Sequence, residues 1–261
     1  MKKYRKTIGF IAAVVFWLAV WEALSLFINR EILLPSPYKV IKRLTELLCE
    51  KDYYISVSSS LIRVLLGFAG GAVIGYILGF AAFFIHPARV LLDPLLTVIR
   101  ATPVASFIIL ALVWIGKTLV PSFTAFLMVT PIVYSGVIRG LESTDKQLYE
   151  VTKVFHLGFA AKLTVLYVPS SLPLFISSCK TALGMAWKAG IAAEVLCSLK
   201  NSIGGNVYTS KLYLESVDLM AWTLTVIILS LLLEKLLSFS LGGISEKYTV
   251  TEISGGKNNV A

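Results

Sequence analysis

The sequence predicts an all-helical integral membrane protein with about six transmembrane helices. First, the chain of 261 residues is 57% hydrophobic and only 15% charged, whereas soluble domains average about 25% charged residues. Second, the apolar residues gather in segments of about 20 residues, the length that crosses the hydrocarbon core. Third, the alternating pattern of a membrane β-barrel is missing, so helices are the remaining way to satisfy backbone groups in lipid.

The first apolar segment covers residues 8–28 and follows a basic start that contains Lys2, Lys3 and Arg5. It is too long for the apolar region of a signal peptide, and no small-residue cleavage pattern follows it. We therefore expect a retained membrane helix. The five further segments cover residues 58–85, 91–115, 120–137, 168–199 and 219–241.

Between the first two apolar segments, residues 35–52 form an amphipathic pattern. Apolar residues such as Val40, Leu44 and Leu47 recur at helical spacing beside Lys42 and Arg43. This pattern is typical of a helix that lies on the membrane surface. The predicted organisation is thus an N-terminal helix with this outer helix (residues 1–53), a membrane core (54–245) and a cytoplasmic tail (246–261) that we expect to be disordered.

The basic residues bear on orientation and on partners. More lysines and arginines fall on the side of the N-terminus than on the other side, which favours two cytoplasmic termini. The net charge of +9 is spread between the apolar segments and forms no basic stripe. It is typical of charges that set membrane topology, so we expect a lipid bilayer and no nucleic acid as partner.

The second apolar segment carries a glycine at every fourth position. Because residues four apart lie on one helix face, these glycines predict a groove in which a neighbouring helix packs closely. The glycines are Gly67, Gly71, Gly75 and Gly79.

Catalytic and metal sites are not predicted. The cysteines and histidines, at positions 49, 179, 197, 86 and 156, show no metal-ligand or disulfide spacing. Gly116-Lys117-Thr118 matches the end of a nucleotide-binding loop, but Ala111 stands where its first glycine belongs. We expect no cofactor, metal or nucleotide to bind this chain.

Several ionisable residues fall inside the apolar segments, where charge is expensive and most often functional. Arg63 and Arg100 lie near segment ends and can reach the interface. Lys180, Lys188 and Glu194 lie in a segment that also holds serine, threonine and glycine, as expected beside a water-filled pathway. A cationic Lys188 there would suit an anionic solute. We therefore predict that Arg100, Lys180, Lys188 and Glu194 belong to the pathway.

The polar stretch of residues 140–167 is too short and too polar to span. Leu148, Val151, Val154 and Phe155 form one apolar helical face. A short amphipathic helix of this kind suits docking into a groove of a partner protein, with packing on the membrane surface as the alternative.

This stretch resembles the EAA loop of ABC-importer permeases, in which Glu-Ala-Ala is followed by a glycine and a distal Leu-Pro. Glu150-Val151-Thr152 stands at the Glu-Ala-Ala position, and Pro169 stands at the proline. The family's glycine would fall at His156, whereas this chain has Gly158. The resemblance assigns coupling to an ATPase to Glu150, Val151, Thr152, Gly158 and Pro169, and the displaced glycine leaves the turn after the docking helix open.

Further motifs extend the resemblance over nearly the whole chain. They are similar to permeases of the nitrate/sulfonate/taurine/bicarbonate branch, also described as binding-protein-dependent transport system inner membrane components. The matching segments are Trp21-Glu22, Leu34-Pro35-Ser36-Pro37, residues 60–68, Leu92-Asp93-Pro94-Leu95, Arg100-Ala101-Thr102-Pro103, Ala186-Trp187 and Ala192-Ala193-Glu194.

The resemblance implies a type I ABC-importer permease fold with a cytoplasmic coupling helix. It also implies a multi-pass protein of the bacterial inner membrane, with a second permease copy as partner in a homodimer. An ABC ATPase subunit would hydrolyse the ATP, and an extracytoplasmic solute-binding protein would deliver the solute. The chain itself would not be an enzyme. The solute would be small, such as a sulfonate or nitrate anion or a vitamin precursor.

Two other classes of membrane protein have signatures of their own. A stand-alone secondary transporter or channel needs coupling ions or a filter and often carries an internal repeat. A membrane-embedded enzyme needs a nucleophile or a metal set. The sequence offers none of these features, and the secondary transporter or channel is the alternative that we keep.

Overall fold

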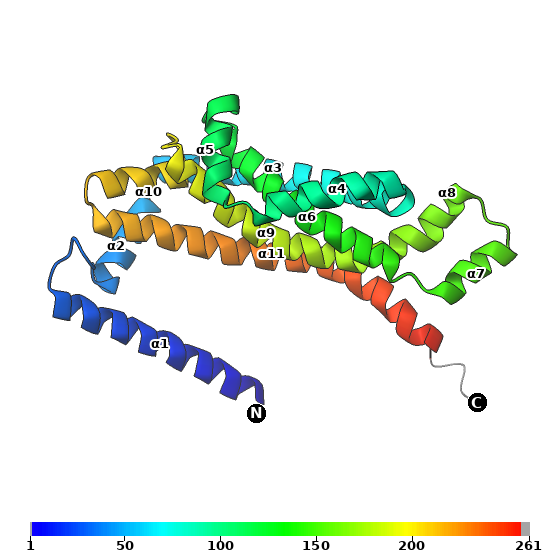
Figure 1. Ribbon diagram of the computed structural model, residues 1–261. Coiled ribbons are helices and arrows are strands. Elements are labelled where there is room, and N and C mark those ends of the chain that lie inside the picture. Colours follow the sequence, from blue (N-terminus) through cyan, green and yellow to red (C-terminus); the bar gives the residue numbers. More distant parts are fainter. Residues whose placement is uncertain (1, 257–261) are drawn as a thin grey trace.

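The computed structural model describes the backbone of residues 2–256 and the side chains of residue 9 and residues 12–240. All elements in this part of the chain are helical, which confirms the predicted all-helical class. Figure 1 shows an elongated bundle with α2 and α10 at one end and α7 at the other. The bounds are α1 Lys2–Ile28, α2 Pro37–Leu47, α3 Lys51–Phe84, α4 His86–Ala101, α5 Val104–Ile115, α6 Val120–Glu142, α7 Lys146–Val154, α8 Phe159–Lys162, η1 Leu163–Tyr167, α9 Val168–Leu196, α10 Ile203–Leu212 and α11 Ser216–Gly256.

Four described helices are long and apolar enough to cross a membrane: α3, α6, the continuous run Phe159–Leu196, and Ser216–Ser240 within α11. Together α4 and α5 pass the same test as one bent span. An additional apolar stretch, Ala12–Ile28, belongs to α1 and is shorter. Of the about six predicted spans, the described residues thus supply four single helices and one bent pair, while the first predicted span, residues 8–28, is described as apolar only over Ala12–Ile28 and is shorter than a full span.

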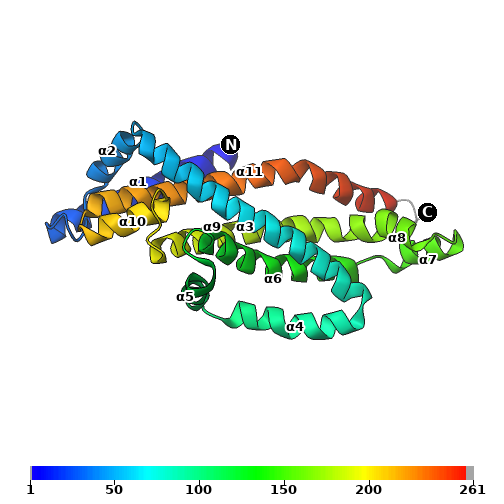
Figure 2. The same ribbon diagram turned by 90° about the horizontal axis from the view of Figure 1, so that it is seen from above.

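The predicted span of residues 91–115 is not one straight helix. It is divided into α4 and α5, which meet at an angle of 104°. The reason is Pro103, whose ring fixes its own backbone, lacks an N–H and disfavours helical geometry at the preceding residue. Thr102 accordingly has extended backbone angles, φ −80° and ψ 132°. Figure 2 shows this angled pair to one side of the bundle.

The helix predicted to start at residue 168 begins earlier. The short helix α8 and one π-helical turn, η1, lead into α9 without a break. Pro169 is the second residue after the π-helical turn and stands in the first turn of α9. A proline in a helix clashes with the carbonyl four residues before it, and the wider π-helical turn relieves that clash.

The tail predicted to be disordered, residues 246–261, is helical where the structure describes it. The last helix, α11, continues to Gly256, because no proline interrupts the chain after Ser216. Residues 257–261 lie outside the described residues.

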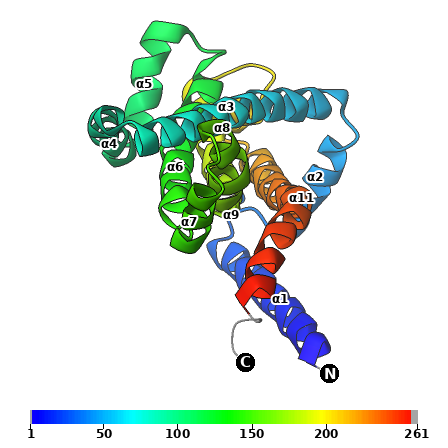
Figure 3. The same ribbon diagram turned by 90° about the vertical axis from the view of Figure 1, so that its right-hand side faces the viewer.

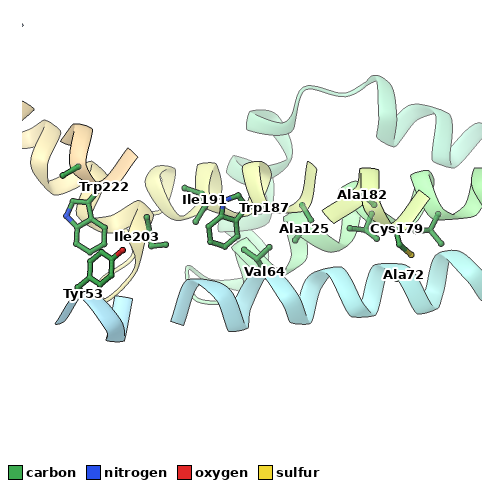
Figure 4. Packing of buried hydrophobic residues seen from close by; sticks show 14 of the residues in the cluster. Tyr53, Val64, Ala72, Ala125, Cys179, Ala182, Trp187, Ile191, Ile203 and Trp222 are labelled. Atoms are coloured by element: carbon green, nitrogen blue, oxygen red, sulfur yellow. The ribbon is translucent and has the colours of Figure 1, made fainter. Parts of the chain in front are cut away.

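The centre of the bundle is the packing of α9 against α3, α6 and α11, which surround it when the bundle is viewed along its axis (Figure 3). Figure 4 shows Val64, Ala125 and Trp187 within this core. Small residues such as Ala182 and Ala186 of α9 are fully buried there, so the helices approach closely.

The four spaced glycines of α3 lie against α6. A Cβ added at Gly67 would stand 2.1 Å from the Ser122 carbonyl oxygen, and one at Gly71 would stand 2.8 Å from the Cβ of Val129. Gly75 and Gly79 meet Thr130 to Val137 at similarly short distances. Successive glycines along α3 meet α6 residues of increasing number, so α3 and α6 run parallel.

The amphipathic segment near residue 40 is helix α2. Ser36 caps its N-terminus, and Val40 and Leu47 are buried. Its Arg43 forms a paired hydrogen bond with Asp218 of α11, at 2.6 Å and 3.1 Å. These hydrogen bonds raise the pKa of Arg43 above its ordinary value. Partial burial of the guanidinium lowers the pKa, but its effect is smaller. The ion pair therefore fixes α2 to the start of α11.

Candidate functional site

The first candidate site is α7, at one end of the bundle. Asp145 caps this helix, because its side chain accepts a hydrogen bond of 2.7 Å from the Gln147 backbone N–H. Thr152 is buried and its hydroxyl donates to the Tyr149 carbonyl within the helix, whereas Glu150 and Val151 are exposed. Four apolar side chains on α7 and its C-cap are about half exposed or more: Leu148, Val151, Val154 and Phe155.

The turn after α7 has a left-handed residue at His156, with φ +47°. The His156 N–H bonds to the Lys153 carbonyl at 2.9 Å, and the Leu157 N–H bonds to the Thr152 carbonyl at 3.1 Å. This pair of hydrogen bonds is the Schellman motif, in which glycine usually occupies the left-handed position. The histidine therefore stands at the glycine position of the family pattern and adopts the conformation that glycine favours.

Gly158 has no such requirement. Its φ is −66° and a Cβ added there would meet nothing within 4 Å. Its backbone conformation is open to any residue. The glycine that the sequence pattern offered as a substitute is therefore not needed for the turn.

The second candidate site is one exposed face of α9, between its contacts with α6 and α11. Lys188 is exposed on this face together with Ser177, Thr181 and Met185, and Lys180 is half-buried. The face thus combines small polar groups, a thioether and a lysine within a membrane-spanning helix.

Arg100 lies elsewhere, near the end of α4. Its guanidinium donates to the hydroxyl of Ser135 on α6, and its side chain is exposed. A second link in the same pair of helices runs from the Tyr134 hydroxyl to Asp93, at 2.6 Å. Arg100 therefore belongs to the contact between α4 and α6 rather than to the α9 face.

Glu194 is fully buried and does not reach the exposed face of α9. Its carboxylate accepts hydrogen bonds from the Ser60 hydroxyl at 2.7 Å, Arg63 at 3.2 Å and the Gly204 N–H at 3.1 Å. Sequence reasoning placed Glu194 in the pathway because hydropathy does not reveal that residues from α3 and α10 enclose it. The structure brings together Arg63 and Glu194, and does not join either of them to Lys188.

Sequence reasoning missed a further carboxylate, Glu234 of α11. A Cβ added at Gly184 would stand 2.9 Å from its Oε1. Gly184 lies one helical turn from both Lys180 and Lys188, so the carboxylate meets α9 between the two lysines. The available signal was an acidic residue inside the apolar segment of residues 219–241.

Comparison with known proteins decides the family. The chain matches the family described as "Binding-protein-dependent transport system inner membrane component" over residues 71–248. The chain belongs to this family. It is therefore a permease subunit of an ABC importer.

Two relatives in this permease family illustrate the likeness. SsuC of Bacillus subtilis, named for aliphatic sulfonates transport, is 27% identical over 203 residues, which is 76% of this chain and 72% of SsuC. The nitrate import permease protein NrtB of Synechocystis is 26% identical, with 90% of this chain and 88% of NrtB covered. The crystal structure of an amino acid ABC transporter with histidines has the same fold, with a TM-score of 0.60, 11% identity, and coverage of 79% of this chain and 96% of that chain.

Proposed function

We propose that an ATPase subunit docks on α7 and that its closure moves the membrane helices. The observation that carries this proposal is the uncovered apolar face of α7, where Val154 and Phe155 are 75% and 72% exposed. An apolar helix face at the end of a bundle fits a groove of a partner protein. The partner, rather than this chain, would bind and hydrolyse ATP.

We propose that the α7 end of the bundle faces the cytoplasm. The distribution of lysines and arginines along the sequence supports this orientation. In Figure 1, α11 starts beside α10 and runs toward the α7 end, whereas α1 runs from below the middle of the bundle to its end near α2. With the α7 end inside, both termini would be cytoplasmic in the bacterial inner membrane. A solute-binding protein would then meet the α10 end.

We propose that two copies of the chain enclose the pathway. The angled pair α4 and α5 leaves apolar side chains uncovered to one side of the bundle, among them Leu91, Val98, Val113 and Trp114. A second copy is the partner that would cover them in a homodimer. The exposed face of α9 would then line the space between the copies.

We propose that the solute is a small molecule, either an anion such as a sulfonate or nitrate or a vitamin precursor. The support is the exposed Lys188 within a spanning helix, with Lys180 two turns away, together with the names of the relatives above. We expect Lys188→Ala to lower the uptake of such an anion severalfold, because one favourable charge is lost. Unchanged uptake in this variant would exclude the role.

The docking proposal is tested by co-purification of the ATPase with permease variants. Val154→Asp places a charge on the apolar face of α7 and is expected to abolish co-purification while the permease still folds, because the side chain is exposed. Leu48→Asp is the matched control, since Leu48 is an exposed apolar residue of the C-cap of α2 at the other end. Equal co-purification with both variants would refute docking on α7.

Uptake under ATP depletion tests the alternative function. If uptake stops when ATP is removed while the proton gradient is kept intact, the importer is driven by its ATPase. Uptake that survives under these conditions would instead indicate a stand-alone secondary transporter or channel.

A further inference from the structure

The buried carboxylate of Glu194 stands where three helices meet. Arg63 and Ser60 come from α3, Glu194 comes from α9, and the Gly204 N–H belongs to the first turn of α10. The Ser60 hydroxyl donates to Glu194 and also accepts a hydrogen bond of 3.0 Å from the Ile203 N–H. We call these residues, Ser60, Arg63, Glu194, Ile203 and Gly204, the α10 joint.

The joint holds the N-terminus of α10. The first N–H groups of a helix have no partner within that helix. Here the Ile203 and Gly204 N–H groups bond to side chains of α3 and α9, and the Gly205 N–H bonds to the N-cap Ser202 at 2.9 Å. A further hydrogen bond of 3.0 Å runs from Asn206 to Ser56 of α3. With ten residues, α10 is too short to span, so these contacts fix its position.

The glycines at the joint make the approach possible. A Cβ at Gly204 would lie 2.4 Å from the Cβ of Glu194. One at Gly190 would lie 2.5 Å from a methyl carbon of Val64. The chain therefore omits side chains at the places where α9 meets α10 and α3.

The joint also lies beside the angled pair. Ala193 of α9 and the C-cap residue Cys197, one and three positions from Glu194, pack with Ile108 and Ala111 of α5. At its other end, α10 leads to Leu212, Tyr213 and Leu214, whose side chains are exposed. The carboxylate of Glu194 thus lies between two surfaces. One is the exposed apolar turn after α10, and the other is the angled pair α4 and α5 that the proposed second copy would cover.

From this geometry we infer that Glu194 is a positioning residue that holds α10 in place to receive the solute-delivering protein. The inference rests on the proposed orientation, in which the α10 end faces outward. Glu194 touches no solute in this role. It acts through α10, because Glu194 and Ser60 accept hydrogen bonds from the first N–H groups of that helix.

Glutamine is the informative substitution at this position. Both carboxylate oxygens of Glu194 accept hydrogen bonds, Oε1 from Arg63 and Oε2 from Ser60 and Gly204. The amide nitrogen of glutamine only donates, so in either orientation one donor would face another donor. The size of the side chain is kept, and only the hydrogen bonding and the charge change.

The first test is hydrogen exchange on the purified permease in lipid nanodiscs. Glu194→Gln and Ser60→Ala are each expected to speed exchange of the α10 amides by about tenfold, while the α7 amides keep their wild-type protection. Glu215→Gln is the matched control, since Glu215 is an exposed carboxylate just after α10. Unchanged exchange of α10 in Glu194→Gln would overturn the inference, as would an equal increase in α7.

The second test uses the complete importer in proteoliposomes. The half-saturating concentration of the solute-binding protein is expected to rise about tenfold in Glu194→Gln. A purely structural role would lower the maximal uptake rate and leave this concentration unchanged, and that result would overturn the inference. Absence of an ATPase from the wild-type complex would refute the proposed function, whereas the exchange experiment would still test the joint.

Discussion

Replacement of Gly67 by alanine tests the closest contact of the bundle. The new Cβ would lie 2.1 Å from the backbone carbonyl oxygen of Ser122 and 2.8 Å from the Cβ of Ala125. Ordinary contact begins near 3.4 Å, so α3 and α6 would have to separate by more than 1 Å. Because the opposing atom belongs to the backbone, no rotamer change relieves the overlap.

The expected cost follows from two opposing terms. Overpacking of a closely packed interior costs about 1–3 kcal/mol, and the backbone overlap at Gly67 favours the upper value. Alanine in a helix gains about 1 kcal/mol over glycine. The net loss is therefore about 2 kcal/mol, which corresponds to a melting temperature lower by roughly 4–8 °C on the scale of soluble domains.

Gly70 of the same helix supplies the control. A Cβ there would meet only Phe126, at 3.6 Å, which is an ordinary contact. Gly70→Ala is therefore expected to leave the melting temperature unchanged or to raise it. Thermal unfolding in detergent, followed by fluorescence of the buried Trp187 and Trp222, measures both variants. If Gly67→Ala melts at or above Gly70→Ala, the proposed close packing of α3 on α6 is wrong.

Two further predictions concern the ends of the bundle. His156→Gly is expected to stabilise the turn after α7 by about 0.5–1 kcal/mol, since it removes left-handed strain but adds chain flexibility. The gain should appear as slower amide exchange in α7, and Gly158→Ala, where the Cβ has free space, should leave exchange unchanged. Asp218→Asn is expected to weaken the attachment of α2 by about 1 kcal/mol, because the paired hydrogen bond with Arg43 is only partly shielded from solvent. Proteolysis of α2 should accelerate in this variant, and the difference from wild type should shrink in high salt.

Several features of the fold were predictable from local patterns. The apolar segments indicated the spans, and the regular glycines of α3 indicated one closely packed face. The helix that packs on this face was not predictable, because both α6 and α9 contain small residues and either could have been the partner. The break before α5 was signalled by Pro103, although hydropathy alone joined both helices into one span.

The candidate sites show where sequence reasoning stops. Glu194 looked like a pathway residue because a membrane carboxylate is expected to be functional. Its partner Ser60 lies 134 residues earlier in the chain, and its partner Gly204 belongs to the separate short helix α10. Only the fold brings these residues together. The displaced glycine left the turn after α7 open for a different reason: His156 adopts the left-handed conformation with backbone hydrogen bonds on both sides of the turn, which its residue type does not indicate.

The attachment of α7 has a mechanical consequence. The segment that contains α7 is joined to α6 on one side and, through α8 and η1, to α9 on the other. These two helices pack against each other along their lengths, with Gly136 and Gly140 against Ser178 and Ser171. A force applied to α7 would therefore reach α6 and α9 at the same time, through the chain on both sides of α7. It would rotate α6 and α9 together as one rigid body instead of sliding one helix past the other.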